Sequence, residues 1–248
     1  MGSLIALEQQ GRVRRLILNR PEKLNALTPA MEEQLVSALD EAAADEDIGC
    51  VVLSGAGRAF CAGFDLNEMS GISGTSDAAS DLANNERRVA KWMQIRSFSK
   101  PLIAQVHGYC IGVANELVGC CDVVVCAEST RIGMPEVREF ALPPTLGYWP
   151  LILGPGRTKE LLFTGRLIDG AEAVRLGLAQ AVAEDEALAS MVDEIAAKIA
   201  SASPAALAVC KHAVNSWVDS AVSSAIRQGP ALHSVYHQAI RATHQADP

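Results

Sequence analysis

Two glutamates occupy positions where a carboxyl group would be held firmly enough to do chemistry. Glu116 falls in the first turns of a predicted helix, directly after a glycine-containing turn. Glu136 follows Pro135, whose ring restricts the chain just before it. Two carboxyl groups facing one substrate can act as general acid and general base if their surroundings separate their pKa values. Taken alone, each could instead be an ordinary polar residue, Glu116 near a helix start and Glu136 in a turn.

Two glycine-containing segments could bring backbone N–H groups close to a ligand. In residues 57–66, the small Ala62 and Gly63 would let the backbone approach a ligand closely. Residues 106–117 run from a strand end through Gly112 into a helix. Because the first N–H groups of a helix lack partners within it, this end favours negative charge that develops on a ligand. The two segments therefore predict a binding site, although the same glycines could serve as turn formers.

Alternating strands and helices would hold these segments in place. Thr28 followed by Pro29 is a favourable helix start, with an N-cap hydroxyl and a proline at the first helical position. The small, polar residues 70–80 predict a loop. Strands are predicted at residues 4–8, 12–19, 50–53, 102–106 and 122–126, and helices from residue 28, at 83–97, near 114–118, at 186–200 and from residue 203.

The order of these elements indicates an α/β fold built as a spiral of repeated units. After about residue 180 the pattern is helical, with no further predicted strand. We therefore expect a core of residues 1–190 and a helical C-terminal arm of residues 191–248.

Composition and charge disfavour several classes of function. The net charge of −8 disfavours a nucleic-acid partner, because phosphate contacts need a basic face. No apolar run approaches the roughly 20 residues needed to span a bilayer. The first residues lack the basic start and long apolar stretch of a signal peptide. We therefore expect a cytoplasmic protein with neither a nucleic acid nor a membrane as partner.

Other common sites are also disfavoured. The seven cysteines form no CxxC pair and no Cys/His cluster at zinc spacing, so we expect reduced, mostly buried thiols and no metal. Cys61 and Cys110 lie nearest the predicted site. Gly55-Ala-Gly57 lacks the third glycine of a dinucleotide fingerprint, and no Gly-x-Ser-x-Gly elbow occurs.

Four segments together resemble the enoyl-CoA hydratase/isomerase (crotonase) family. They are residues 19–27, 60–66, 107–117 and 161–178, in the family's order and spacing. The resemblance extends over roughly residues 4–215. It implies a crotonase-like spiral of ββα units with a helical C-terminal trimerisation region, and hence a homotrimer or a dimer of trimers. It also implies an acyl-CoA thioester as substrate and no cofactor beyond the coenzyme A of that substrate.

The resemblance implies roles for individual residues. The backbone N–H groups of Phe64 and Val113 would bind the thioester carbonyl oxygen, and bind it more tightly as an enolate forms. Glu116 would activate water and Glu136 would transfer a proton at C2. The positions that match substrate- and CoA-binding residues of the family are Lys23, Leu24, Ala26, Ala62, Asp65, Leu66 and Gly112.

Several residues depart from the family pattern. Val113 stands where hydratases usually have glycine, and its β-branched side chain takes space beside the thioester. Phe64 likewise replaces a residue that is commonly small. Leu146, Tyr148 and Trp149 also differ from the usual pattern, so we expect them to reshape the acyl pocket.

The expected activity is hydration of a 2-enoyl-CoA to a 3-hydroxyacyl-CoA. A first alternative is a Δ3–Δ2 double-bond shift or another reaction of the family. Since that shift needs only one carboxylate, the pair Glu116 and Glu136 favours hydration. A second alternative is a non-catalytic acyl-CoA binder, which crowding by Val113 would favour.

Overall fold

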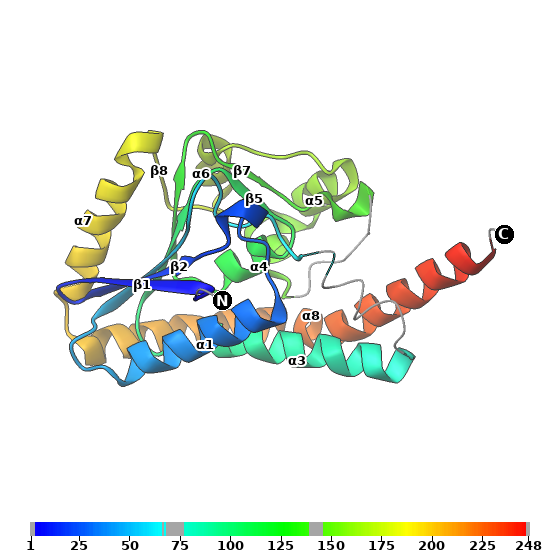
Figure 1. Cartoon of the computed structure of the whole chain (residues 1–248), viewed down its shortest axis with the longest axis horizontal. Coiled ribbons are helices and arrows are strands. Elements are labelled where there is room, and N and C mark those ends of the chain that lie inside the picture. Colours follow the sequence, from blue (N-terminus) through cyan, green and yellow to red (C-terminus); the bar gives the residue numbers. More distant parts are fainter. Residues whose placement is uncertain (1–2, 66, 68–76, 139–145, 247–248) are drawn as a thin grey trace.

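A six-stranded sheet forms the centre of the computed structural model, which describes residues 3–65, 67, 77–138 and 146–246 (Figure 1). The spatial order is β1-β2-β3-β4-β6-β8. Only β1 is antiparallel to its neighbour, and it forms with β2 the hairpin that the sequence predicts. The strands are β1 (Ile5–Gln10), β2 (Val13–Leu18), β3 (Cys50–Gly55), β4 (Leu102–Val106), β6 (Val123–Ala127) and β8 (Ala181–Ala183).

Both faces of this sheet are buried, because successive side chains of a strand point to opposite sides. In β3, Val51 and Leu53 join the larger hydrophobic core, whereas Cys50 and Val52 join a second, smaller one. Helix α7 (Leu188–Ala200) closes the smaller core. The sheet is therefore a rigid, two-sided base for the loops at its strand ends.

Helices α1, α3 and α8 run beside one another along the other side of the sheet (Figure 1). Helix α1 begins as predicted, since the Thr28 hydroxyl accepts a hydrogen bond from the Met31 N–H at 3.1 Å. Helix α3 begins at Ala78 instead of residue 83, because the Asp77 carboxylate caps its first turn. The helices are α1 (Pro29–Ala44), α3 (Ala78–Arg96), α4 (Ala114–Gly119), α5 (Tyr148–Thr164), α6 (Gly170–Leu176), α7 and α8 (Pro204–Ala246).

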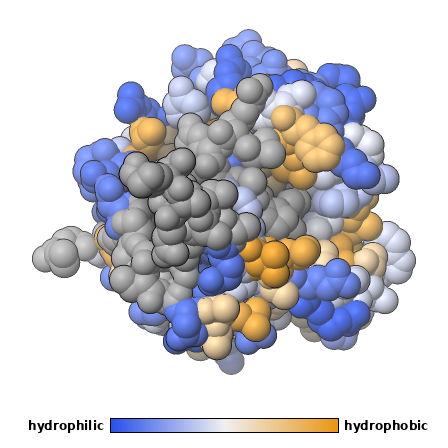
Figure 2. Space-filling view, turned by 90° about the vertical axis from the view of Figure 1, so that its right-hand side faces the viewer, coloured by the Kyte–Doolittle hydropathy of each residue, from blue (hydrophilic) through white to orange (hydrophobic). Residues whose placement is uncertain are grey.

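Most of the predicted loop at residues 70–80 lies outside the described residues. Short 3-10 helices occur at η1 (Pro21–Lys23), η2 (Pro135–Arg138) and η3 (Asp185–Ala187). No helix in the described ranges combines the length and the apolar character needed to cross a membrane, α8 included. Seen from the end where α8 terminates, the surface carries separate apolar patches between hydrophilic regions (Figure 2).

A second, smaller sheet pairs β5 (Tyr109–Ile111) with β7 (Arg131–Gly133) in parallel. Isolated bridges extend it on both sides, from Cys61 to Cys110 and from Ile132 to Ile168. This layer joins the two glycine-containing segments to the residues that precede Glu136.

Candidate active site

The two glycine-containing segments lie in register, which places the two predicted N–H donors at matching positions. Cys61 and Cys110 form a parallel bridge, and the Ile111 N–H donates to the Cys61 carbonyl at 3.1 Å. Each segment then turns at a glycine with positive φ, +97° at Gly63 and +59° at Gly112. Phe64 and Val113 are the residues that follow these two turns.

The N–H groups of Phe64 and Val113 donate to no acceptor in the part of the chain that the structure describes. Leu27 forms a parallel bridge with Phe64, but its hydrogen bonds go to the flanking Gly63 and Asp65. The side chains of Phe64 and Val113 are partly buried and pack against the larger core. Both amides are therefore available to a ligand oxygen.

Asn115 fixes the second turn from inside the fold. Its side-chain amide nitrogen lies 3.2 Å from the Cys110 carbonyl, 3.0 Å from that of Gly112 and 2.9 Å from that of Gly133. The Gly112 N–H also donates to the Gly133 carbonyl, at 2.8 Å. A buried amide that serves several carbonyls removes the freedom of the turn that carries Val113.

The predicted CoA-binding positions lie on two segments that run side by side. The Ala62 N–H donates to the Leu24 carbonyl at 3.0 Å, and the Asp65 N–H donates to the Leu27 carbonyl at 2.9 Å. These bonds bring Leu24, Ala26, Ala62 and Asp65 into one continuous strip next to Phe64.

Arg20 links the two segments of this strip by hydrogen bonds. Its guanidinium donates to the Ala26 carbonyl at 2.8 Å and to the Asp65 carboxylate at 3.0 Å. The charge of Arg20 is thus matched within the protein, whereas Lys23 is exposed at the edge of the strip. Leu66, the last predicted position, lies outside the described residues.

Glu116 is 5% exposed on α4, one turn beyond Gly112. Its carboxylate accepts a hydrogen bond from the Leu146 N–H at 3.2 Å. The carboxyl group is therefore fixed in a protected position at the end of the turn that carries Val113.

Glu136 stands on η2 with its carboxyl group against Gly112. A Cβ atom on Gly112 would lie 2.2 Å from Glu136 Oε1, so the absence of a side chain at residue 112 makes room for this carboxyl. Oε2 is buried and has no hydrogen-bond partner among the described residues. Burial raises the pKa of Glu136 to about 7. Glu136 therefore lies against the turn at Gly112, and Glu116 follows the same turn four residues along the chain on α4.

Two backbone N–H groups and two carboxyl groups around adjacent turns are found here in a chain of a known family. The chain matches the model of the family described as enoyl-CoA hydratase/isomerase over residues 8–244. It belongs to that family.

Relatives within the enoyl-CoA hydratase/isomerase family match nearly the whole chain. The 2,3-dehydroadipyl-CoA hydratase of Escherichia coli is 37% identical, over 95% of this chain and 90% of its own. A probable enoyl-CoA hydratase, mitochondrial, of Dictyostelium discoideum is 34% identical over 92% and 82%, respectively. A crystal structure of a probable enoyl-CoA hydratase from Mycobacterium thermoresistibile superposes with a TM-score of 0.90 at 30% identity and covers 96% of both chains. The crotonase-like fold is therefore confirmed.

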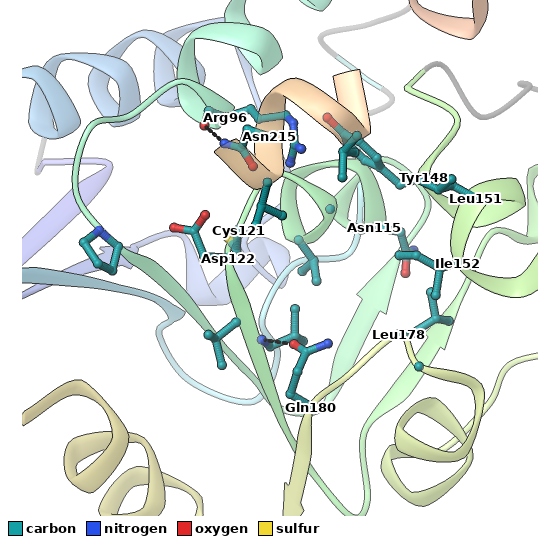
Figure 3. Close-up of a pocket in the computed structure, with 18 of the residues that line it drawn as sticks. Arg96, Asn115, Cys121, Asp122, Tyr148, Leu151, Ile152, Leu178, Gln180 and Asn215 are labelled. Atoms are coloured by element: carbon teal, nitrogen blue, oxygen red, sulfur yellow. Dashed lines mark hydrogen bonds between the residues drawn. The ribbon is translucent and has the colours of Figure 1, made fainter. Parts of the chain in front are cut away.

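A cavity of about 470 Å³ has residues of α4 in its wall (Figure 3). Its largely apolar wall includes Asn115, Tyr148 and Trp149, but neither Glu116 nor Glu136. Tyr148 and Trp149 line this cavity, and the expectation that they shape the acyl pocket stays a prediction. Leu146 donates its N–H to the carboxylate of Glu116, a predicted catalytic group.

The cysteines near the site, Cys61 and Cys110, are buried in surroundings that favour the neutral thiol. All seven, each within the described ranges, are free thiols. Burial raises the pKa of Cys61 to about 12 and raises that of Cys110 well above its usual value. No group of His, Cys, Asp or Glu side chains in the described part of this family member could hold a metal ion.

Sequence reasoning missed three residues that build the site. Asn115 holds the second turn, Asn25 donates to the Ala56 and Ala59 carbonyls before the first turn, and Arg88 stacks on Phe64. Asn25 adopts a left-handed conformation, with φ of 55°, which asparagine tolerates better than most residues. The available signal was that Asn25 and Asn115 lie inside the recognised segments 19–27 and 107–117.

Proposed function

We propose that this family member is an enoyl-CoA hydratase that adds water across the C2=C3 bond of a 2-enoyl-CoA to give a 3-hydroxyacyl-CoA. The observation that carries the proposal is a pair of carboxyl groups next to the second turn. Glu116 is buried on α4 and accepts from the Leu146 N–H, and Glu136 lies against Gly112. Relatives of nearly the same length are named as enoyl-CoA hydratases, which supports the same assignment.

In this proposal the Phe64 and Val113 N–H groups bind the thioester carbonyl oxygen. Addition of water at C3 moves electron density onto that oxygen, so donors fixed in advance stabilise the enolate more than the substrate. One such donor typically contributes about 10²–10³ in rate. The packing of the Val113 side chain against the core supports a hole that is open to the ligand.

The two acids divide the proton transfers. Glu116 takes a proton from water as the water oxygen attacks C3, and Glu136 delivers a proton to C2. With a pKa of about 7, Glu136 is protonated in a large share of molecules at neutral pH, as a proton donor must be. Each general acid or base typically contributes about 10²–10⁴ in rate.

The coenzyme A moiety lies along the strip beside Phe64 in this proposal. Lys23, Leu24, Ala26, Ala62, Asp65 and Leu66 would contact it, and Gly112 would border the acyl group. The exposed Lys23 suits the phosphate groups of CoA, because Arg20 is already paired with Asp65.

The test is hydration of crotonyl-CoA and a longer enoyl-CoA, followed by loss of the absorbance of the conjugated thioester. We expect turnover by the wild type and loss of at least about a hundredfold in Glu116→Gln and Glu136→Gln, with acyl-CoA binding retained. Glu128→Gln, which removes an exposed carboxylate, should leave turnover unchanged. Unchanged turnover in both active-site variants would overturn the acid–base assignment. Double-bond migration with only one variant impaired would favour an isomerase, and acyl-CoA binding without any turnover would indicate a non-catalytic binder.

We also propose that the chain forms a homotrimer or a dimer of trimers through the face around the cavity of Figure 3. Ile152 and Val214 line that cavity, yet are 44% and 61% exposed. Trp217, one turn beyond Val214 on α8, is 66% exposed. Large apolar side chains gathered at one exposed face usually mark an association surface. The helical arm of residues 191–248 contributes α8 to it.

A further inference from the structure

The direction of the second proposed donor is set by the peptide group that carries it. The Gly112 carbonyl and the Val113 N–H belong to one peptide group, which is planar and trans. In a trans peptide group the carbonyl and the N–H point in opposite directions. Whatever holds the Gly112 carbonyl therefore also aims the Val113 N–H.

Asn115 holds this carbonyl with two donors. The residue is 5% exposed, its backbone N–H donates to the Gly112 carbonyl at 2.9 Å, and its side-chain Nδ2 donates to the same oxygen at 3.0 Å. The Cys110 thiol lies 3.8 Å from Asn115 Oδ1 and donates to it. This contact distinguishes the two ends of the amide, because it leaves Nδ2 as the end that faces the carbonyls.

Both sides of Gly112 depend on the same amide. The Gly112 N–H donates to the Gly133 carbonyl at 2.8 Å, and Asn115 Nδ2 reaches that carbonyl at 2.9 Å. Gly112 has a φ of +59° and no Cβ atom, so its backbone has little restraint of its own. Rotation of the peptide group after Gly112 would turn the Val113 N–H away from the ligand and present the carbonyl in its place. The hydrogen bonds from Asn115 oppose that rotation.

The first proposed donor is aimed in another way. The Gly63 carbonyl shares a peptide group with the Phe64 N–H and accepts a hydrogen bond from the Leu27 N–H at 2.7 Å. That bond is made by the backbone, and the Cys61 thiol adds only a weak donor at 3.7 Å. The second donor relies instead on a side-chain amide, so a single substitution can change its aim.

We infer that Asn115 is a positioning residue for the reaction, which aims the Val113 N–H at the thioester oxygen through the Gly112 peptide group. This inference rests on the proposed hydratase function. In this role Asn115 acts through Val113 and touches no reacting atom. Hydrogen bonds to the carbonyl also polarise the peptide group, which makes its N–H a stronger donor. Because negative charge builds up on the thioester oxygen as water adds, loss of this aim lowers kcat more than it weakens binding.

Two substitutions remove the side-chain donor to different extents. Asn115→Leu keeps a similar volume but cannot donate, whereas Asn115→Ser keeps one hydroxyl donor. For hydration of crotonyl-CoA we expect kcat to fall about a hundredfold in Asn115→Leu and about tenfold in Asn115→Ser, with KM within about threefold of the wild type. Val118→Ala, which changes another side chain of α4 and leaves the Gly112 carbonyl bonded, should keep the wild-type kcat.

The carbonyl ¹³C resonance of bound hexanoyl-CoA reports the aim of the donors without turnover. Two donors on the thioester oxygen move this resonance downfield. We expect the displacement to be complete in Val118→Ala and to shrink by about half in Asn115→Leu, because one of the two donors is lost. A substitution that only destabilised the fold would lower the melting temperature and leave the displacement of the bound ligand intact.

Full displacement in both Asn115→Leu and Asn115→Ser, or a raised KM with unchanged kcat, would overturn the inference. Should Asn115→Leu not fold, Asn115→Ser decides by the same two readouts. A wild type that leaves the resonance unmoved would overturn the inference as well. Failure of the hydratase function would look different, because a wild type that displaces the resonance yet hydrates no enoyl-CoA would end that proposal alone. The resonance of the variants would then decide the role of Asn115.

Discussion

Replacing Glu136 by glutamine should stabilise the protein in a pH-dependent way. The Glu136 carboxyl is buried against Gly112, and its Oε2 has no partner in the described part of the chain. Burial disfavours the charged form and raises the pKa from 4.5 to about 7. In the unfolded chain the group ionises near its ordinary value, so folding requires uptake of a proton between these two pH values.

The size of the effect follows from the two pKa values. Below pH 4.5 the carboxyl is neutral in both states, and its contribution to stability is fully present. As pH rises through 7 this contribution is lost, up to about 3 kcal/mol, because each unit of pKa difference corresponds to about 1.4 kcal/mol. Glutamine has a similar shape and stays neutral, so Glu136→Gln should not undergo this loss.

Urea unfolding of both proteins at matched concentration, from pH 4.5 to pH 8.5, measures the difference directly. The variant should match the wild type at the acid end and exceed it by about 2–3 kcal/mol at the alkaline end. Glu128→Gln, at an exposed position, controls for the general loss of one negative charge. A stability difference that does not change with pH would refute the claim that Glu136 is buried as a neutral acid.

Three further predictions concern activity and assembly. For hydration, kcat/KM should fall as pH rises through about 7, because Glu136 must hold the proton that it gives to C2; a flat pH–rate profile from pH 6 to pH 8.5 would contradict this. Gly112→Ala should lower kcat roughly a hundredfold by displacing the Glu136 carboxyl, whereas Gly154→Ala, also at positive φ but with open space around it, should leave kcat unchanged. Val214→Glu should reduce the molar mass seen by light scattering to that of the monomer; an unchanged assembly would show that this face is not the interface.

The elements of this fold could be predicted because their signals are local. Thr28 and Pro29 mark a helix start without reference to the rest of the chain. The burial of both faces of β3 follows from its unbroken apolar run. The start of α3 was missed because the small, polar residues before it resemble a loop, although Asp77 is a favourable N-cap.

The positions of the site residues could be predicted from motifs in the sequence. The contacts that hold those residues in place could not, because they join segments far apart in the chain. Asn115 bonds to Gly133 across 18 positions of sequence, and Arg20 bonds to Asp65 across 45. The stacking of Arg88 on Phe64 joins two segments that no local pattern connects. Tyr148 lines the cavity of Figure 3, and its expected role in shaping the acyl pocket stays a prediction.

The central claim is that the Phe64 and Val113 amides converge on one thioester oxygen. It is tested most directly by the ¹³C chemical shift of hexanoyl-CoA labelled at the carbonyl carbon, measured free and bound at saturation. Because this thioester is saturated, no turnover complicates the spectrum. Two donors on the oxygen would polarise the carbonyl and move the bound resonance downfield. A bound resonance at the position of the free ligand would contradict the account.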